Sequence, residues 1–223
     1  KRDGCDTWKE FYVNDAGNQI EKFGCSLEAR YLQIFKGDEI EFPEDGYQGE
    51  DIKDLAKEYA DLNGDSLVNV SAEERKKALV DYALPKNIKK MQADMEKYKI
   101  FYDKWFFESE LHKSGAVKAV VDLLTEKGLT YEKDGAVWYK NKEVLTQKLL
   151  KEGKSQKYID NLELKDDVLI RQNGNPTYFT ADIAYHKNKF DRGFTTLIDV
   201  WGADHHGHVM RMKGAMDAIG YDG

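Results

Sequence analysis

The stretch DVLIRQNGNPTYFTADIAYHKNKFDRGFTTLIDVWGADHHGHVMRMKGAMDAIG, residues 167–220, decides the fold. Two apolar runs, at 167–170 and 195–201, are each followed by turn residues and then by a helical pattern, at 181–190 and at 209–220. Short apolar runs bounded by turn residues predict buried strands. Strands that alternate with helices indicate βα units and a parallel sheet, so the sequence predicts an α/β fold.

The rest of the chain adds further strands and a mostly helical insertion. Apolar spacing and capping signals predict strands near 9–13, 104–109 and 136–140, and helices over 19–36, 51–62, 71–84, 85–102 and 114–127. The helix expected over 71–84 opens with a capping box, Ser71 to Glu74. Pro85 is expected as the first residue of the helix over 85–102, where its missing N–H leaves no helical hydrogen bond unmade.

Composition limits the class of protein. The 223 residues are 41% apolar, 34% charged with both signs mixed, and 12% aromatic, which favours a globular fold over a disordered one. No run approaches 18 apolar residues, so neither a membrane span nor a signal peptide is expected. Two cysteines, Cys5 and Cys25, predict a reduced, cytosolic protein. The net charge of −7 means that a nucleic acid would have to meet a local basic face.

The loop WGADHHGH, residues 201–208, is the first candidate site. It follows an expected strand and precedes an expected helix, where ligands bind in open parallel sheets and where helix N–H groups attract anions. Asp204, His205, His206 and His208 could instead ligate a metal. A metal site would need further aspartate ligands from other loops, which the sequence lacks, and the side chains of adjacent histidines point in different directions. A nucleotide or amino-acid pocket is therefore favoured. The alternative that the loop has only a structural role also stays open.

The second candidate site is GNPTYFTADIAYH, residues 174–186. Thr180 is expected to cap a helix and so to place Asp182 in its first turn, where a carboxylate is favourable. Tyr178 lies four residues earlier. An acid beside an aromatic ring suits a guanidinium, which the acid pairs and the ring covers. The alternative is that Asp182 serves only the helix terminus.

Six segments occur in a recognisable order. They are EFYVNDAGNQIEKFG (10–24), FPEDGYQGEDIKDLA (42–56), FYDKWFFESEL (101–111), KDGAVWYK (133–140), PTYFTADIAYHKNKFDRGF (176–194) and DVWGADHHGHVMRMKGAMDAIGYD (199–222). Together they resemble bacterial arginyl-tRNA synthetase, a class I aminoacyl-tRNA synthetase, nearly from end to end. The lysine-rich stretch at 141–164 departs from the family and is expected to be a surface insertion.

The resemblance implies an incomplete Rossmann-like parallel-sheet catalytic core. Residues 1–27 would form its first part, 28–104 a mostly helical insertion, and 105–223 the remainder with the lysine-rich insertion. Such ligases join arginine to ATP, release pyrophosphate, and pass the arginyl group to tRNA. ATP would bring its own Mg²⁺, with no protein-bound metal. The tRNA for arginine would bind mainly through parts outside this chain.

The resemblance also implies roles for single residues. Tyr178 and Asp182 match positions that hold the arginine guanidinium. Gly202, Asp204 and His205 match the segment against the ribose of the adenylate. Pocket support is expected from Asn14, Asp15, Gly17 and His208.

Both signature motifs of class I enzymes, the His-Ile-Gly-His type and the Lys-Met-Ser-Lys-Ser type, are expected to lie outside residues 1–223. No catalytic residue is therefore expected within the chain, which should be inactive alone, monomeric and cytoplasmic. Two other functions stay open. One is a metal-dependent phosphohydrolase that uses the loop of Asp204, His205 and His206, and the other is a non-catalytic, synthetase-like binding module.

Overall fold

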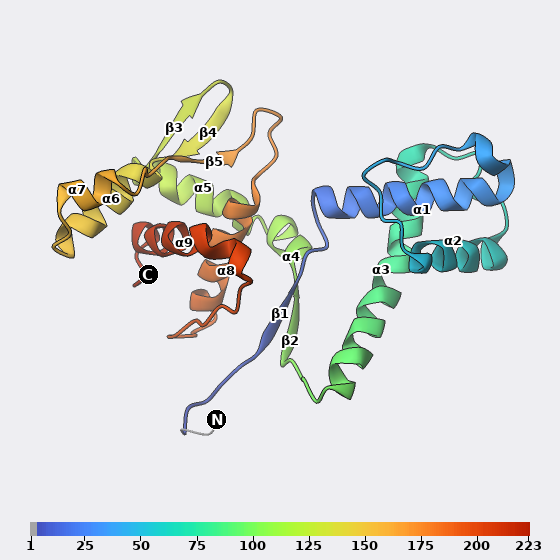
Figure 1. The fold of residues 1–223 in the computed structure, drawn as a ribbon, viewed down its shortest axis with the longest axis horizontal. Coiled ribbons are helices and arrows are strands. Elements are labelled where there is room, and N and C mark those ends of the chain that lie inside the picture. The colour runs from blue at the N-terminus through green and yellow to red at the C-terminus, as the bar shows by residue number, and fades with distance from the viewer. Residues whose placement is uncertain (1–3) are drawn as a thin grey trace. The chain divides into compact units, whose positions relative to one another are not determined.

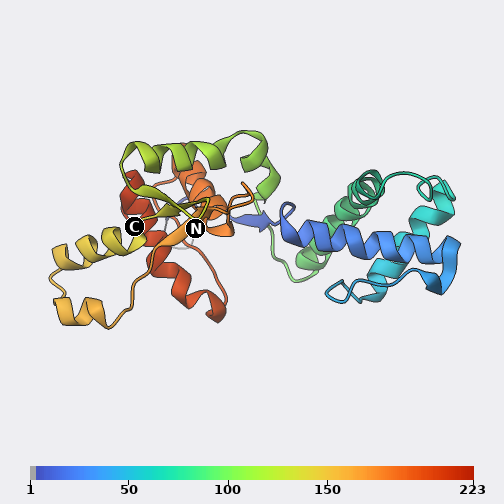
Figure 2. The same cartoon turned by 90° about the horizontal axis from the view of Figure 1, so that it is seen from above.

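The computed structural model describes residues 4–223, and of Asp38, Asp204 and His206 the backbone alone. The chain divides into two compact units, Lys1–Ser109 and Glu110–Gly223, which we call unit 1 and unit 2. Helices and strands occur in both units, and the α/β class is confirmed (Figures 1 and 2). The expected limits at 27/28 and 104/105 stay predictions. No helix among the described residues is both long and apolar enough to cross a membrane.

Unit 1 contains a pair of parallel strands with helices between them in the chain. Strand β1 (Glu10–Val13) pairs in parallel with β2 (Lys104–Phe107), with Phe11 beside Trp105. Their ring centroids lie 4.6 Å apart with the rings tilted by 32°, and Tyr102 meets both edge-on. A parallel pair needs a long crossover, and the helical insertion supplies it here, as the sequence predicts.

The insertion is a three-helix core. Helix α1 (Asn18–Lys36) packs against α2 (Glu50–Asn63) and α3 (Ala72–Lys97), as Figure 1 shows, and the short 3-10 turn η1 (Gly37–Glu39) follows α1. Apolar positions at helical spacing bury one face of each helix; they include Leu27, Tyr31, Ile52, Ala56, Leu79 and Ala83. Tyr31 is fully buried, and its hydroxyl donates to Gly64 O at 2.8 Å, so the phenol joins α1 to the end of α2.

Helix α3 is longer than predicted. Ser71 caps it as expected, its Oγ accepting from Glu74 N at 3.2 Å. The break predicted at Pro85 is wrong, because Pro85 lies inside one continuous helix. A proline there removes one backbone hydrogen bond. Burial of Ala83 and Ile88 on either side holds the helix against this loss.

Unit 2 surrounds a small sheet with helices. Helix α4 (Glu108–Lys113) spans the boundary between the units, and α5 (Ala116–Glu126) ends at Gly128 as predicted. Strands β3 (Thr130–Lys133), β4 (Ala136–Tyr139) and β5 (Asp167–Ile170) pair antiparallel in that order. The lysine-rich stretch forms α6 (Asn141–Lys151) and α7 (Gln156–Asp160), which follow one another in Figure 2.

Two expectations for this unit are wrong. The sheet after residue 130 is antiparallel, since β3 and β4 form a hairpin and β5 joins its second strand. Residues 195–201 form no strand, although their pattern is apolar. A strand exists through its ladder of hydrogen bonds to a neighbour, and no described strand of unit 2 pairs with this segment. Ile198 and Val200 are therefore 83% and 94% exposed.

The core of unit 2 lies between the sheet and the helices α8 (Tyr178–Asp191) and α9 (His206–Ile219). Helix α5 packs on α8, and α6 packs on α9. Gly214 of α9 permits the second contact, because a Cβ there would lie 2.6 Å from Leu145 Cδ2 of α6. Burial raises the pKa of Tyr139, whose ring is fully enclosed in this core.

Candidate functional site

The start of α8 carries two of the expected site residues. The helix begins at Tyr178 with Thr177 as its N-cap, so the cap predicted at Thr180 is wrong, and Asp182 lies in the second turn. Thr180 is instead fully buried, and its hydroxyl donates to Leu169 O of β5 at 2.7 Å. Thr177 likewise donates to Val168 O at 2.8 Å, so both hydroxyls fasten α8 to β5.

Tyr178 and Asp182 are four residues apart on α8 and therefore share one face. Tyr178 is 43% exposed, and the side chain of Asp182 is 32% exposed. His208 of α9 lies beside them, with Nε2 3.0 Å from Asp182 Oδ2. Since a carboxylate oxygen accepts, the imidazole donates and fixes the orientation of the acid. A partly exposed carboxylate held in this way can pair with a cation that arrives from solvent.

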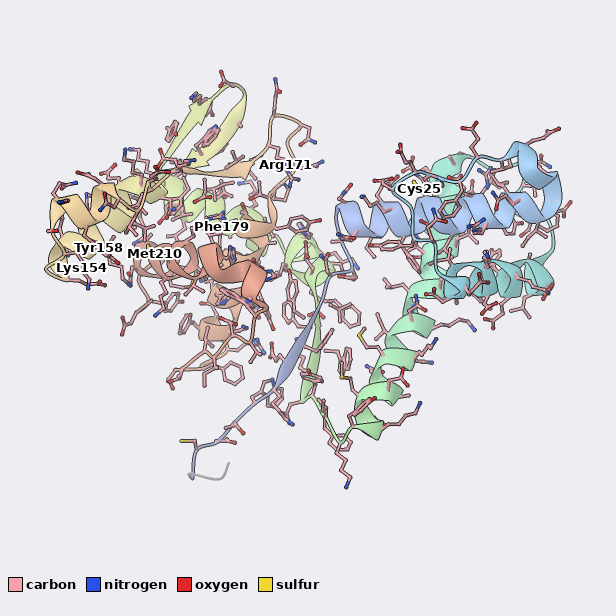
Figure 3. The ribbon with its side chains drawn as sticks, in the orientation of Figure 1. Cys25, Lys154, Tyr158, Arg171, Phe179 and Met210 are labelled. Atoms are coloured by element: carbon pink, nitrogen blue, oxygen red, sulfur yellow. The ribbon has the colours of Figure 1, made fainter. Side chains whose placement is uncertain are left out.

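The loop 201–208 folds into a turn that leads directly into α9. A 3-10 turn, η2 (Ala203–His205), closes as His205 N donates to Gly202 O at 3.0 Å. The ring of His208 is packed by Trp201 at 5.0 Å and by Phe179, labelled in Figure 3, at 5.7 Å. The expected residues Gly202 and His205 therefore lie on one short turn beside His208, while the side chain of Asp204 lies outside the described part.

A second acid–imidazole pair lies deeper in the same unit. His186 of α8 is 5% exposed, and its Nε2 lies 2.7 Å from Asp199 Oδ2. Lys189 Nζ lies 3.0 Å from the other oxygen of Asp199. Burial alone would raise the pKa of Asp199, but the hydrogen bond and charge of His186, with Lys189, outweigh it and lower this pKa to about 2.

A third acid approaches the site from the sheet. Asp167 at the start of β5 forms an ion pair with Arg211 of α9 at 2.6 Å, and the Arg211 guanidinium lies 4.6 Å above the ring of Phe179. Burial raises the pKa of Asp167, although the positive charge of Arg211 opposes the shift. The pair therefore ties α9 to β5 beneath the residues that contact His208.

The other expected support residues belong to unit 1. Asp15 Oδ1 accepts from Ser109 N at 2.8 Å, which joins the end of β1 to the first turn of α4. With its amide nitrogen turned toward Glu108, Asn14 donates to Glu108 Oε2 at 3.2 Å. Gly17 caps α1 at a φ of +71°, a conformation that favours glycine. These contacts fix the β1–α1 turn within its own unit.

The metal-binding interpretation of the loop gains no support. Among the described residues no group of three or more His, Cys, Asp or Glu side chains is arranged to hold a metal ion. His208, one of the four candidate ligands, is engaged by Asp182 and enclosed by rings. The side chains of Asp204 and His206 are not described, so the expected absence of metal stays a prediction.

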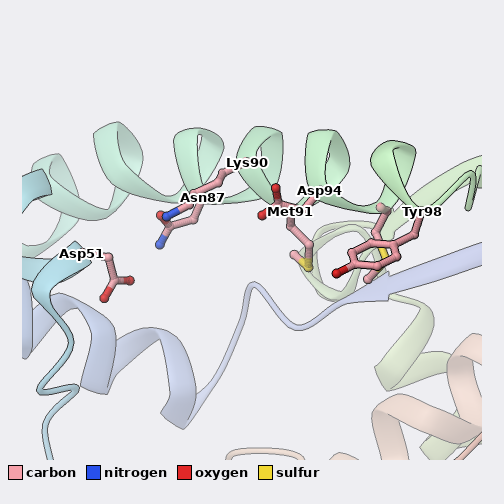
Figure 4. A pocket seen from close by; sticks show the side chains of 7 residues that line it. Asp51, Asn87, Lys90, Met91, Asp94 and Tyr98 are labelled. Carbon is pink, nitrogen blue, oxygen red and sulfur yellow. The ribbon is translucent and has the colours of Figure 1, made fainter.

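Unit 1 has hollows of its own. One cavity of about 410 Å³ is lined by Asn14, Gln19, Tyr47, Asp51, Asn87 and neighbouring apolar side chains. A second, of about 330 Å³, follows the exposed face of α3 past Met91 and Tyr98 and also includes Asp51 and Asn87 (Figure 4). The first has Asp51 as its one charged side chain and the second has charges of both signs, so neither lining indicates a particular ligand.

Three residues of the site had been given no individual role from the sequence. His186, Asp199 and Trp201 join Asp182 and His208 through packing between α8, the extended segment before η2, and α9. The spacing of four between Asp182 and His186 is a helical signal visible in the sequence. The partner of His186 is not visible there, because Asp199 comes from outside the helix.

The chain matches no family model, but its sequence is similar to those of arginine–tRNA ligases. It is 56% identical over 220 residues to an arginine–tRNA ligase of Caldanaerobacter subterraneus, covering 98% of this chain and 36% of that protein. It is 53% identical over 219 residues to one of Ruminiclostridium cellulolyticum, covering 97% of this chain and 36% of that protein.

Solved structures agree. A crystal structure assigned to an arginyl-tRNA synthetase of Campylobacter jejuni matches with a TM-score of 0.76 and 37% identity, over 96% of this chain and 42% of the other. The arginyl-tRNA synthetase of Plasmodium falciparum, at 16% identity and a TM-score of 0.59, shares the fold. The chain spans about a third of the length of the curated relatives that it matches. The resemblance is thus confirmed, and this chain corresponds over nearly its whole length to a segment of arginyl-tRNA synthetases.

Proposed function

We propose that this chain is a segment of an ATP-dependent ligase that joins arginine to its tRNA through an arginyl-adenylate. The observation that carries the proposal is the 56% identity over 98% of the chain to a protein named arginine–tRNA ligase. The ligase would act in the cytoplasm as a monomer, with Mg²⁺ arriving on ATP and with tRNA binding mainly outside this segment. These details rest on the family alone.

Within the segment, we assign the arginine side chain to Asp182 and Tyr178. A guanidinium taken out of water needs an opposite charge, and an unpaired one is costly. Asp182 supplies that charge on a partly exposed helix face, and His208 orients it through Oδ2. Tyr178, one turn earlier and 43% exposed, offers a ring to the flat face of the cation.

The nucleotide is assigned to the turn of Gly202, Asp204 and His205. Support comes from its place at the start of α9, whose first backbone N–H groups favour an anion. The chain's own residues would bind and orient arginine and ribose, while the groups that stabilise the ATP phosphates would come from outside residues 1–223. The isolated chain should therefore show no arginine-dependent pyrophosphate exchange. Such exchange would place catalytic groups within the segment.

The test is a chimera in which this chain replaces the matching segment of the Caldanaerobacter ligase. We expect arginine-dependent pyrophosphate exchange and tRNA charging. Asp182→Ala should lower kcat/KM for arginine by roughly 10²–10³-fold, because breaking a largely desolvated ion pair costs about 3–5 kcal/mol. KM for ATP should be nearly preserved.

The matched control is Asp191→Ala on the same helix, where the acid pairs with Lys187 in an exposed i, i+4 bridge. Thermal melts of both variants exclude unfolding as the cause. Normal melting with an unchanged kcat/KM for Asp182→Ala would show that Asp182 does not bind arginine. A folded chimera without arginine activity would favour the non-catalytic binding module.

A further inference from the structure

Asp199 is an acid to which the sequence motifs give no role, yet one helix binds both of its carboxylate oxygens. His186 Nε2 lies 2.7 Å from Oδ2, and Lys189 Nζ lies 3.0 Å from Oδ1. His186 and Lys189 are three residues apart and so lie on one face of α8. The segment before Trp201, which has no regular structure, is therefore fastened to α8 at this residue.

The hydrogen bonds of His186 determine its charge. Its Nδ1 lies 2.7 Å from the main-chain oxygen of Asp182, and a carbonyl oxygen only accepts, so Nδ1 carries a proton. Its Nε2 lies 2.7 Å from Asp199 Oδ2, and a carboxylate oxygen also accepts, so Nε2 carries a proton as well. An imidazole that donates from both nitrogens is an imidazolium.

This ion pair is connected to the proposed arginine site at two points. Asp182 accepts from His186 at its main-chain oxygen and from His208 at its carboxylate. Trp201, two residues beyond Asp199, lies 6.3 Å from the ring of His186 and 5.0 Å from that of His208. Asp182, His186, Asp199, Trp201 and His208 thus form a closed set of contacts, one of them through the main chain of Asp182, that joins α8, the 199–201 segment and α9.

We propose that the buried His186 and Asp199 form an ion pair that positions Asp182 and Trp201, and that both are positioning residues for the cation that binds at Asp182. The identity of that cation rests on the proposed function, whereas the charge of His186 and its coupling to His208 are properties of this chain. His186 faces Asp199, the Asp182 carbonyl, and the rings of Tyr185 and Trp201, and Lys189 binds the other oxygen of Asp199.

Neutralising Asp199 shows how the coupling works. Without a counter-charge, the buried imidazolium is no longer favoured, and the neutral ring can donate from one nitrogen only. The contact of His186 with residue 199 then loses its charge assistance and becomes a weaker, neutral hydrogen bond, so Trp201 is held less firmly beside His208. The orientation of the Asp182 carboxylate changes in turn, although Asp182 itself is intact.

The first measurement is the protonation of the ring nitrogens of His186 by NMR, on the 223-residue chain labelled with ¹⁵N-histidine, with His186→Gln used for assignment. We expect both nitrogens to be protonated at pH 7 and the ring to become neutral in Asp199→Asn. A neutral His186 in the unsubstituted chain overturns the proposal.

The second measurement is the response of the His208 ring signals to Asp199→Asn, with Asp191→Asn as the matched control. Asp191 pairs with Lys187 on the same helix, away from His186. We expect Asp199→Asn to shift the His208 signals and the control to leave them unchanged. Unmoved His208 signals in a folded Asp199→Asn protein overturn the coupling.

The third measurement is kinetic and uses the chimera with the Caldanaerobacter ligase. Asp199→Asn should raise KM for arginine about tenfold and leave KM for ATP within about twofold, because a small displacement of a binding group is costly. Asp199→Glu, which keeps the charge, should restore part of the loss. Equal effects on both substrates would overturn the positioning role. A chimera without arginine activity beside the expected NMR results would contradict the proposed function and leave the ion pair supported.

Discussion

Acidification should remove the stability that the Asp199 ion pair contributes to unit 2. The folded pKa of about 2 lies below the ordinary value of 3.8. A carboxyl with a lowered pKa stabilises the fold fully above its unfolded pKa, and the contribution is lost as the pH falls through the folded pKa. The side chain is 25% exposed, so with an allowance for solvent screening the contribution is about 2 kcal/mol.

The substitution Asp199→Asn isolates this contribution from the other acids of the chain. Asparagine keeps the shape of the carboxylic acid without its charge. The difference in free energy of unfolding between wild type and variant should be about 2 kcal/mol at pH 6. It should shrink as the pH falls from about 4 to about 2, where the wild-type acid is also neutral.

The assay is urea unfolding of both proteins between pH 2 and 6, followed by far-UV circular dichroism and by tryptophan fluorescence. Trp201 reports directly, because it contacts the ring of His186. Asp191→Asn, whose ion pair is exposed, serves as control and should differ little from wild type at any pH. A difference for Asp199→Asn that is absent at pH 6, or that persists unchanged at pH 2, refutes the reasoning.

Three further stability changes follow from the packing and are measured by urea unfolding with hydrogen exchange. Arg75→Ala should destabilise unit 1 by about 3–5 kcal/mol, because it leaves Glu28 and three carbonyl oxygens without their partner. The control Lys57→Ala removes an exposed ion pair and should cost below about 1 kcal/mol. Equal costs would contradict the stabilising role of the hydrogen bonds that Arg75 makes. Pro85→Ala should stabilise α3 by roughly 1 kcal/mol. The substitution restores a helical hydrogen bond, and this gain exceeds the cost of the greater conformational entropy of the unfolded chain. A loss of stability would argue against a continuous helix. Ile198→Thr should change stability by less than about 0.5 kcal/mol, because the side chain is 83% exposed, and a loss above 2 kcal/mol would mean that it is buried.

Local sequence signals predicted most helices and strands because these signals act within a few residues. The cap at Ser71 and the glycine after α5 are formed where the sequence places them. The start of α8 was misplaced by three residues because two threonines compete, and β5 decides between them. Thr180 donates to Leu169 O of that strand, so a tertiary contact selects Thr177 as the cap.

The candidate site likewise contains residues that local sequence signals revealed and residues that only the tertiary structure reveals. Asp182, Tyr178 and His208 were found from motif and resemblance, and the structure brings Asp182 and His208 within hydrogen-bond distance. Their roles toward arginine and ATP stay predictions. The partnership of His186 with Asp199 could not be found in the sequence, since either residue alone is an ordinary polar side chain. It depends on how a segment without regular structure lies against α8.

The segment 195–201 shows why an apolar run can predict a buried strand where the chain forms neither a strand nor a buried face. Ile198 and Val200 point away from the unit and are exposed, while Asp199 between them is held by His186 and Lys189 of α8. The alternation expected of an extended chain is therefore present, but its inward position is polar. Periodicity alone cannot distinguish an apolar face that is buried from one that is exposed. An ion pair worth about 2 kcal/mol, rather than apolar burial, fixes this segment and with it the residues proposed to bind arginine.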